Sequence, residues 1–126
     1  MPSPPSPAPE DVPFPDVALQ EPGRDGASRL VKLENDYGCP WPLWNSLGPM
    51  EHDEIDLPEP LRARLLAWAK EFDEHFHWER GWDSPNLSEP HAREGRALRD
   101  ALAAHLGPGF DVRLSVWECG IPDRLA

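Results

Sequence analysis

The residues of this sequence that are best suited to chemistry are its histidines, of which there are five. His75 and His77 fall within a predicted helix, where residues two apart point about 200° away from each other and cannot bind the same ion. Glu71 and His75 share one face of that helix at a spacing of four residues, but they supply only two ligands. The sequence has neither the pattern His-Glu-x-x-His nor paired Cys-x-x-Cys motifs. We therefore expect no metal site, and we interpret His75 as a partly buried hydrogen-bonding residue.

The two cysteines and the many carboxylates do not indicate catalysis either. Nucleophilic catalysis needs a cysteine beside a histidine and an orienting carboxylate, and no known local signature surrounds Cys39 or Cys119. If the first and last strands are neighbours, the two thiols lie close together, but a reducing cytosol favours two free thiols. Carboxylate pairs of the glycosidase type arise by chance among 23 acids, and no Gly-rich phosphate loop is present. We expect a protein that is not an enzyme and needs no cofactor.

Aromatic residues next to acids form the clearest candidate binding feature. The stretch 36–46, DYGCPWPLWNS, places Trp41 and Trp44 among prolines, shortly before residues 51–59, which carry five acids. Tryptophan is enriched at interface hot spots because it contributes a large area and a donor, although loop tryptophans also fold back as lids on small cores. We interpret each loop tryptophan taken singly as a lid, and expect at least one of the group to face a partner. The predicted partner-binding residues are Tyr37, Trp41, Trp44, Glu51, Asp53, Glu54, Asp56 and Trp82.

The charge of the chain indicates what kind of partner it attracts. The formal net charge is −11, and residues 29–126 alone contain 18 acids and 11 bases. Such a chain is repelled by phosphate backbones and by anionic membranes, so we expect neither nucleic acid nor membrane as a partner. A partner drawn by this charge is a basic protein. The alternative is that the charge serves solubility alone.

Three short strands are predicted from the hydrophobic pattern. Residues 28–34 alternate imperfectly, and the turn signal at 35–38 is followed by a short returning edge strand that includes Leu43 and Trp44. Residues 110–117 alternate almost perfectly, which predicts a half-buried antiparallel strand with Trp117 on its polar face.

Two helices are predicted between these strands. The first covers 57–77, with Asp56 as its N-cap and Gly81 as its C-terminal cap, and the second covers 89–106, with Ser88 as its cap. The apolar face of the first helix consists of Leu61, Leu65, Trp68, Ala69, Phe72 and Phe76. The stripe of the second consists of Leu98, Leu102 and Leu106, with Gly95 and Ala101. A glycine on this stripe is predicted to allow close helix approach.

The elements together predict a two-layer α+β fold, in which about three antiparallel strands in the order β-β-α-α-β pack against two helices. Residues 1–28 contain eight prolines and few large apolar side chains, which predicts a disordered tail with polyproline II character. The predicted domain is 29–119, and 120–126 forms a C-terminal extension. The start of the chain has no secretory signal, and no apolar run is long enough to span a bilayer, so we expect a cytoplasmic protein.

The predicted ordered part resembles a group of small acidic actinobacterial proteins known chiefly as hypothetical proteins. The shared pattern starts with Asp36-Tyr37-Gly38 and Pro42-Leu43-Trp44 after a strand, and covers roughly residues 30–116. It continues with the remaining shared positions, which are Leu57-Pro58, Leu65, Trp68, Phe72, Trp78, Asp83-Ser84 and Glu94-Gly95-x-x-Leu98. In size and charge the protein also resembles immunity proteins of bacterial toxin systems. Neither resemblance implies a catalytic residue.

Three hypotheses about function follow. The leading one is an acidic interaction module, immunity-like or antitoxin-like, that covers a basic surface on a protein partner such as a toxin. The alternative is a small-molecule-binding protein or minor enzyme with a Trp-lined pocket. A third is an accessory module delivered by its Pro-rich tail.

Overall fold

The computed structural model describes residues 29–126, so the predicted tail at 1–28 lies outside the described residues. The helices are α1 (Glu59–His75) and α2 (Ser88–Leu106). The strands are β1 (Arg29–Leu33), β2 (Leu43–Asn45), β3 (Gly48–Pro49), β4 (Phe76–His77), β5 (Gly81–Trp82) and β6 (Phe110–Leu114). Two short 3₁₀ helices, η2 (Trp117–Cys119) and η3 (Asp123–Leu125), follow near the C-terminus.

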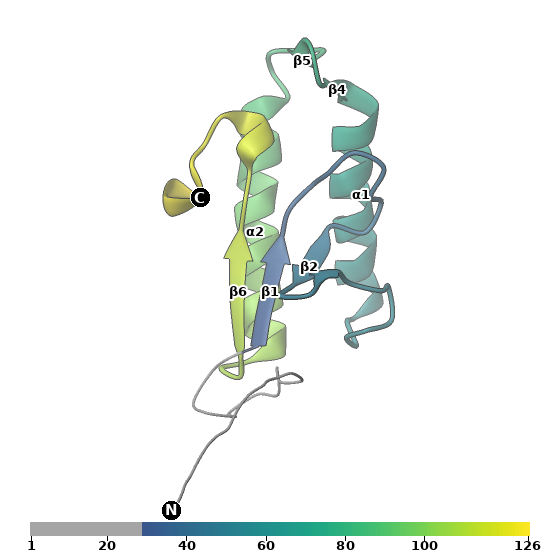
Figure 1. The fold of residues 1–126 in the computed structure, drawn as a ribbon, viewed down its shortest axis with the longest axis vertical. Helices are drawn as coiled ribbons and strands as arrows, with labels where there is room; N and C mark the ends of the chain where they lie inside the picture. The colour runs from purple at the N-terminus through teal and green to yellow at the C-terminus, as the bar shows by residue number, and fades with distance from the viewer. Residues whose placement is uncertain (1–28) are drawn as a thin grey trace, which may run out of the picture.

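The main sheet has the strand order β3-β2-β1-β6, and both helices lie on one of its faces (Figure 1). The predicted α+β class is therefore confirmed. The sheet is mixed, because β1 and β2 are antiparallel whereas β1 and β6 are parallel, with Val31 opposite Val112 and Leu33 opposite Leu114. The expectation of an antiparallel last strand was thus wrong. The parallel pairing follows from the path of the chain, because α2 leads back to the end of the sheet where β1 begins. There the Arg29 amide donates to the Gly109 carbonyl at 3.1 Å, just before β6 starts.

The helices bury the faces that their apolar spacing predicted. Five residues of α1 are buried, namely Leu61, Leu65, Trp68, Ala69 and Phe72. The buried residues of α2 are His91, Ala92, Gly95, Leu98 and Leu102. The predicted caps differ from the observed ones, because Pro58 occupies the N-cap of α1 and Leu87 that of α2, neither with a side-chain cap bond.

The predicted close approach at Gly95 is confirmed. A Cβ atom added there would lie 3.0 Å from Cζ2 of Trp68, 3.2 Å from Leu114 and 3.3 Å from Val116. Real Cβ atoms are seldom so crowded, so the missing side chain lets Trp68 of α1 pack directly on the backbone of α2.

The end of α1 differs from the predicted one. The helix stops at His75 because Phe76 takes an extended conformation (φ −110°, ψ 127°) and pairs with Trp82 across the β4–β5 hairpin. Gly81 does not cap the helix. It lies at the start of β5 with φ +74°, a backbone conformation that favours glycine.

The last strand is shorter than predicted and leads into the η2 helix. It ends at Leu114, and the indole of Trp117 donates to the Asn35 carbonyl at 2.9 Å. The residues after η2 pack back on the sheet, since Asp123 accepts a bond from Ser115 Oγ at 2.8 Å and lies 3.4 Å from the Lys32 ammonium. Within residues 29–126, neither helix has the length and apolarity required to cross a membrane.

Candidate partner-binding site

The four predicted partner-binding acids lie in one loop, residues 51–57, which we call the acidic loop. Ile55 and Leu57 of this loop are buried at 7% and 6% exposure, whereas Glu54 and Asp56 are exposed. The alternation of apolar and acidic residues therefore turns the apolar side chains into the core and the carboxylates towards water.

Hydrogen bonds hold the acidic loop in place. The Glu54 carboxylate accepts bonds from Asn45 Nδ2 at 2.8 Å and from the Glu51 amide at 3.1 Å. Arg62 of α1 donates to the His52 carbonyl at 2.7 Å, and His105 of α2 donates to the Asp56 carbonyl at 2.9 Å. The loop is thus fixed through its backbone and Glu54, while the carboxylates of Glu51, Asp53 and Asp56 remain exposed to solvent.

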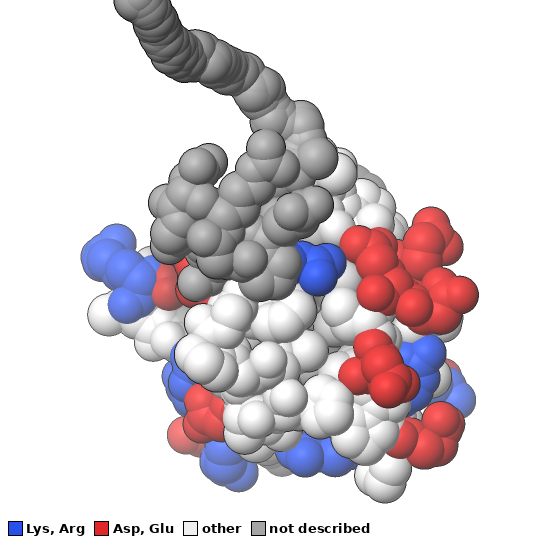
Figure 2. All heavy atoms as spheres, turned by 90° about the horizontal axis from the view of Figure 1, so that it is seen from below, with Lys and Arg blue, Asp and Glu red and all other residues white. Residues whose placement is uncertain are grey.

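The acidic loop also carries uncompensated negative charge. Within residues 29–126, none of its four carboxylates forms an ion pair with a base. Figure 2 shows acidic side chains gathered on one side of the molecule, seen from the end at which α1 begins. Charges that lack a partner inside the protein remain available to a basic surface outside it.

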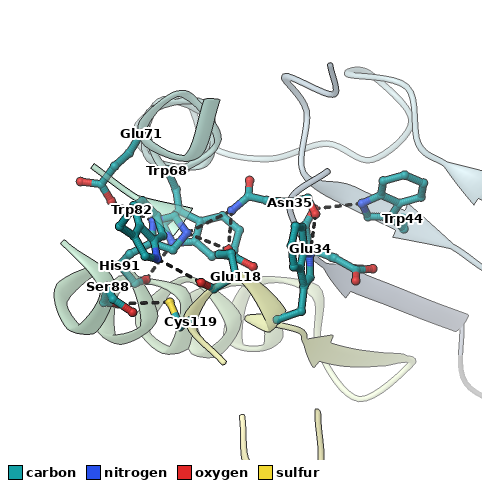
Figure 3. Close-up of polar contacts among 11 residues, drawn as sticks. Glu34, Asn35, Trp44, Trp68, Glu71, Trp82, Ser88, His91, Glu118 and Cys119 are labelled. Carbon is teal, nitrogen blue, oxygen red and sulfur yellow. Dashed lines mark hydrogen bonds and ion pairs between the residues drawn. The ribbon is translucent and has the colours of Figure 1, made fainter. Parts of the chain in front are cut away.

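The two tryptophans that precede this loop lie in different environments. Trp41 is 5% exposed, stacks on the His52 ring at 4.9 Å and has the Arg62 guanidinium 5.3 Å from its ring centre. It closes the core beneath the acidic loop and does not meet solvent. The indole of Trp44 on β2 donates to the Glu34 carbonyl at 2.9 Å (Figure 3). Trp44 is half-buried, so of the two tryptophans it is the one that is partly exposed.

The structure does not bring Tyr37 and Trp82 to the acidic loop. Tyr37 packs 5.4 Å from Phe72, and Trp82 packs 5.4 Å from Phe76, near the end of α1, whereas the acidic loop precedes its start. The helix has 17 residues, which at 1.5 Å per residue makes it about 25 Å long. The structure therefore separates Tyr37 and Trp82 from the four predicted acids by about the length of α1.

A buried polar cluster, which the sequence patterns did not indicate, connects α1, α2 and η2 near the end of α1 (Figure 3). His91 Nδ1 lies 2.8 Å from Glu71 of α1, and His91 Nε2 lies 2.8 Å from Glu118 of η2. Asn35 Nδ2 donates to the same Glu118 oxygen at 2.9 Å. One signal in the sequence could have revealed the histidine, since His91 precedes Gly95, Leu98 and Leu102 at helical spacing and so lies on the apolar stripe.

The surroundings of this cluster indicate a structural role. His91 is 0% exposed, with Trp68 stacked on its ring at 4.6 Å and Trp82 at 4.8 Å, so no substrate can reach it. The adjacent Cys119 thiol donates to the Ser88 carbonyl at 3.2 Å, and burial raises the pKa of this thiol, which makes it a poorer nucleophile.

Three hollows of the described surface have no tryptophan in their walls. The groove between residues 38–40 and α1 holds about 450 Å³ and is lined by Gly38, Cys39, Pro40, Leu66, Ala69, Lys70 and Asp73. Two further hollows, beside Arg113 and beside Leu47, also have no tryptophan in their walls. In residues 29–126, no three His, Cys, Asp or Glu side chains are arranged to hold a metal ion.

Comparison with known proteins identifies a family for this chain. A family model described as Serratia CdiI immunity protein-like matches residues 29–115, which include both helices, the main sheet and the acidic loop. No curated protein matches the sequence. The resemblance to immunity proteins is thereby confirmed, while the resemblance to actinobacterial proteins stays a prediction. Because the match covers more than half of the chain, the chain belongs to the Serratia CdiI immunity protein-like family.

Proposed function

We propose that this protein is an immunity protein that binds a toxin and covers a basic surface on it. The observation that carries the proposal is the match of residues 29–115 to the immunity protein-like family. Binding without catalysis agrees with the buried, fully enclosed ring of His91. It also agrees with the acidic loop, whose exposed carboxylates have no internal ion-pair partner among residues 29–126.

The acidic loop is proposed to attract the toxin, and the predicted residues take different parts in this. Glu51, Asp53 and Asp56 present their charge to the partner, while Glu54 also holds the loop to Asn45. Trp41 supports the loop from within the core, where it stacks on His52. Trp44, Tyr37 and Trp82 are proposed to contribute contact area.

Growth rescue tests the proposed function. The polypeptide encoded by the gene next to this protein's own gene is expressed from an inducible promoter, with and without the full-length protein. We expect the polypeptide to stop growth, the protein to restore it, and the two purified chains to form a complex. A polypeptide that stops growth whether or not the protein is present, and that does not bind it, would contradict the proposal.

Neutralising two loop acids is predicted to slow association with this polypeptide. In Glu51→Gln/Asp53→Asn, the shape of the loop is kept because Glu54 and the bonded carbonyls remain. The association rate at low salt should fall about 10-fold, while the dissociation rate changes little, because charge steers encounters more than it holds complexes. Stopped-flow mixing at several salt concentrations measures both effects.

The matched control removes the same charge from α2. Glu94→Gln/Asp100→Asn also raises the net charge by two, but these acids are paired with Arg64 and Arg99. The association rate of this control should stay within about twofold of the wild-type rate. Equal slowing in both variants would show that only the total charge matters and that the acidic loop is not the attracting surface.

A further inference from the structure

Five aromatic side chains pack together where α1 ends, and a sixth, Trp78, lies in the adjacent hairpin turn; we call this region the aromatic end. The five that pack together are Tyr37, Phe72, Phe76, Trp82 and Trp117. The Trp117 ring centre lies 5.8 Å from that of Tyr37 and 5.5 Å from that of Phe76. Trp78 follows His77 in the turn of the β4–β5 hairpin, which projects at the end of the molecule opposite to the start of α1 (Figure 1).

Three of these rings face water. Trp78 is 76% exposed, Tyr37 49% and Trp117 36%, and they are the exposed aromatic residues of the described chain. A tryptophan as exposed as Trp78 contributes little to the core, because burial is what stabilises an apolar side chain. Several large apolar side chains exposed together mark an interaction surface more often than single ones do.

Two of the three exposed rings at the aromatic end, those of Trp117 and Tyr37, are held in fixed positions. Trp117 donates its indole hydrogen to the Asn35 carbonyl at 2.9 Å, and Asn35 is itself bonded to the buried Glu118. Tyr37 lies in a turn closed by the Cys39 amide and the Asp36 carbonyl at 3.2 Å. Side chains that are already ordered lose little entropy when a partner covers them.

Charge identifies the kind of partner that fits this surface. Asp36 precedes Tyr37, Asp73 follows Phe72 and Glu79 follows Trp78. Within residues 29–126 none of these three carboxylates has an ion-pair partner, and Arg80 is the one base in the hairpin turn. An arginine can lie over an aromatic ring and pair with a carboxylate beside it, whereas nucleic acids and anionic membranes are repelled here.

We propose that the toxin docks on the aromatic end through an arginine-bearing surface that covers Trp78 and Tyr37. This inference rests on the proposed function and assigns different roles in binding to the surfaces at the two ends of α1. The acidic loop at its start speeds the encounter, and the aromatic end slows dissociation. Truncations at interfaces act mostly on dissociation, and tryptophan, tyrosine and arginine are the commonest hot-spot residues.

The test compares Trp78→Ala with Leu47→Ala in the full chain, using the polypeptide from the rescue experiment as the probe. Leu47 is the matched control because it is 82% exposed and also lies in a hairpin turn, between β2 and β3. We expect Trp78→Ala to weaken binding at least about 10-fold, mainly through faster dissociation, and Leu47→Ala to bind like the wild type. Surface plasmon resonance measures the rates, and both variants should melt at the wild-type temperature.

The outcomes distinguish a failure of the proposed docking site from a failure of the proposed function. If the wild type neither rescues growth nor binds the probe, the proposed function fails and the docking site fails with it. If the wild type binds and both Trp78→Ala and Tyr37→Leu bind equally well, the docking site alone is wrong. Weaker binding by Leu47→Ala but not by Trp78→Ala would also overturn it, because the contact would then be on the β2–β3 side.

Discussion

At the scale of single residues, His91 does the most to connect separate parts of the fold. Its two ring nitrogens contact Glu71 of α1 and Glu118 of η2, and Trp68 and Trp82 enclose its ring. A buried polar group is costly unless its partners are in place, so this cluster favours the one arrangement in which all of these segments meet.

Replacing His91 by phenylalanine is predicted to destabilise the protein strongly. Phenylalanine can still stack on Trp68, but it leaves the 0%-exposed Glu118 side chain with only Asn35 as a donor. Leaving a buried polar group without its hydrogen-bond partner in this way costs about 1–3 kcal/mol. Urea denaturation of His91→Phe followed by tryptophan fluorescence measures the loss.

A second replacement shows whether the lost pair is the cause. In His91→Phe/Glu118→Met the buried carboxylate is gone as well, so the double variant should be more stable than His91→Phe alone. If the two substitutions instead destabilise additively, the pair has no coupling energy and the large effect of His91 comes from packing.

Residue roles could be predicted where they depend on local spacing, as the burial of Trp68 shows. They could not be predicted where they depend on distant partners. The apolar stripe of α2 includes the position of His91, but its partners lie 20 and 27 residues away in the sequence. The lid interpretation of Trp41 agrees with its 5% exposure, but nothing local distinguished it from Trp44.

At the scale of elements, the end of α1 shows where periodicity stops being informative. Phe76 continues the apolar spacing of the helix, so the sequence predicted a helix to residue 77. The backbone instead turns extended so that Phe76 pairs with Trp82, and the Asp83 amide bonds to the His75 carbonyl at 2.8 Å. Pairing within the hairpin thus outweighs the helical propensity of the segment at this boundary.

The pairing of His75 with Asp83 is predicted to make the helix end sensitive to pH. The Asp83 carboxylate lies 3.0 Å from His75 Nδ1, and its hydrogen bond raises the pKa of His75 above the ordinary value. A raised folded-state pKa means that the folded protein binds the proton more tightly. The stability from this pair is therefore present below about pH 6.5, the unfolded value, and is lost as the pH rises through the folded value.

The measurement compares the wild type with His75→Gln at pH 5.5 and pH 8.5. The wild type should be the more stable of the two at pH 5.5, and the difference should shrink at pH 8.5. In Asp83→Asn, an NMR titration should show the His75 pKa moving down towards its ordinary value. A stability difference that is the same at both pH values would contradict this role of the pair.

At the scale of the whole molecule, the two layers were predictable but the strand directions were not. Two amphipathic helices and a few short strands leave one way to bury the apolar faces, with both helices on the sheet. The alternation of residues 110–114 is the same for a parallel and an antiparallel strand. The parallel direction of β6 relative to β1 is set by the end of the sheet at which α2 stops, which the alternation does not indicate. The acids of the site were likewise visible in the sequence, whereas the separation of Tyr37 and Trp82 from these acids was not.

The distribution of charge over the whole molecule suggests that the acidic loop is kept for binding at a cost in stability. Acids on α2 are paired with arginines, such as Glu94 with Arg64, whereas no pair forms at Glu51 or Asp53 among residues 29–126. Unpaired like charges repel one another in a domain that already carries more acids than bases. Removing them should therefore help folding even as it slows the encounter with a toxin.

The free energy of unfolding in low and high salt tests this trade-off without any partner. At about 10 mM NaCl, Glu51→Gln/Asp53→Asn should be more stable than the wild type by about 0.5 kcal/mol, because repulsion at helix-like spacings has this order of magnitude. At about 1 M NaCl, where charges are screened within a few ångströms, the difference should vanish. Glu94→Gln/Asp100→Asn, which removes paired acids, should gain nothing at either salt concentration. If the loop variant were less stable than the wild type in low salt, its acids would be stabilising the fold, and their exposure would no longer favour a role in binding.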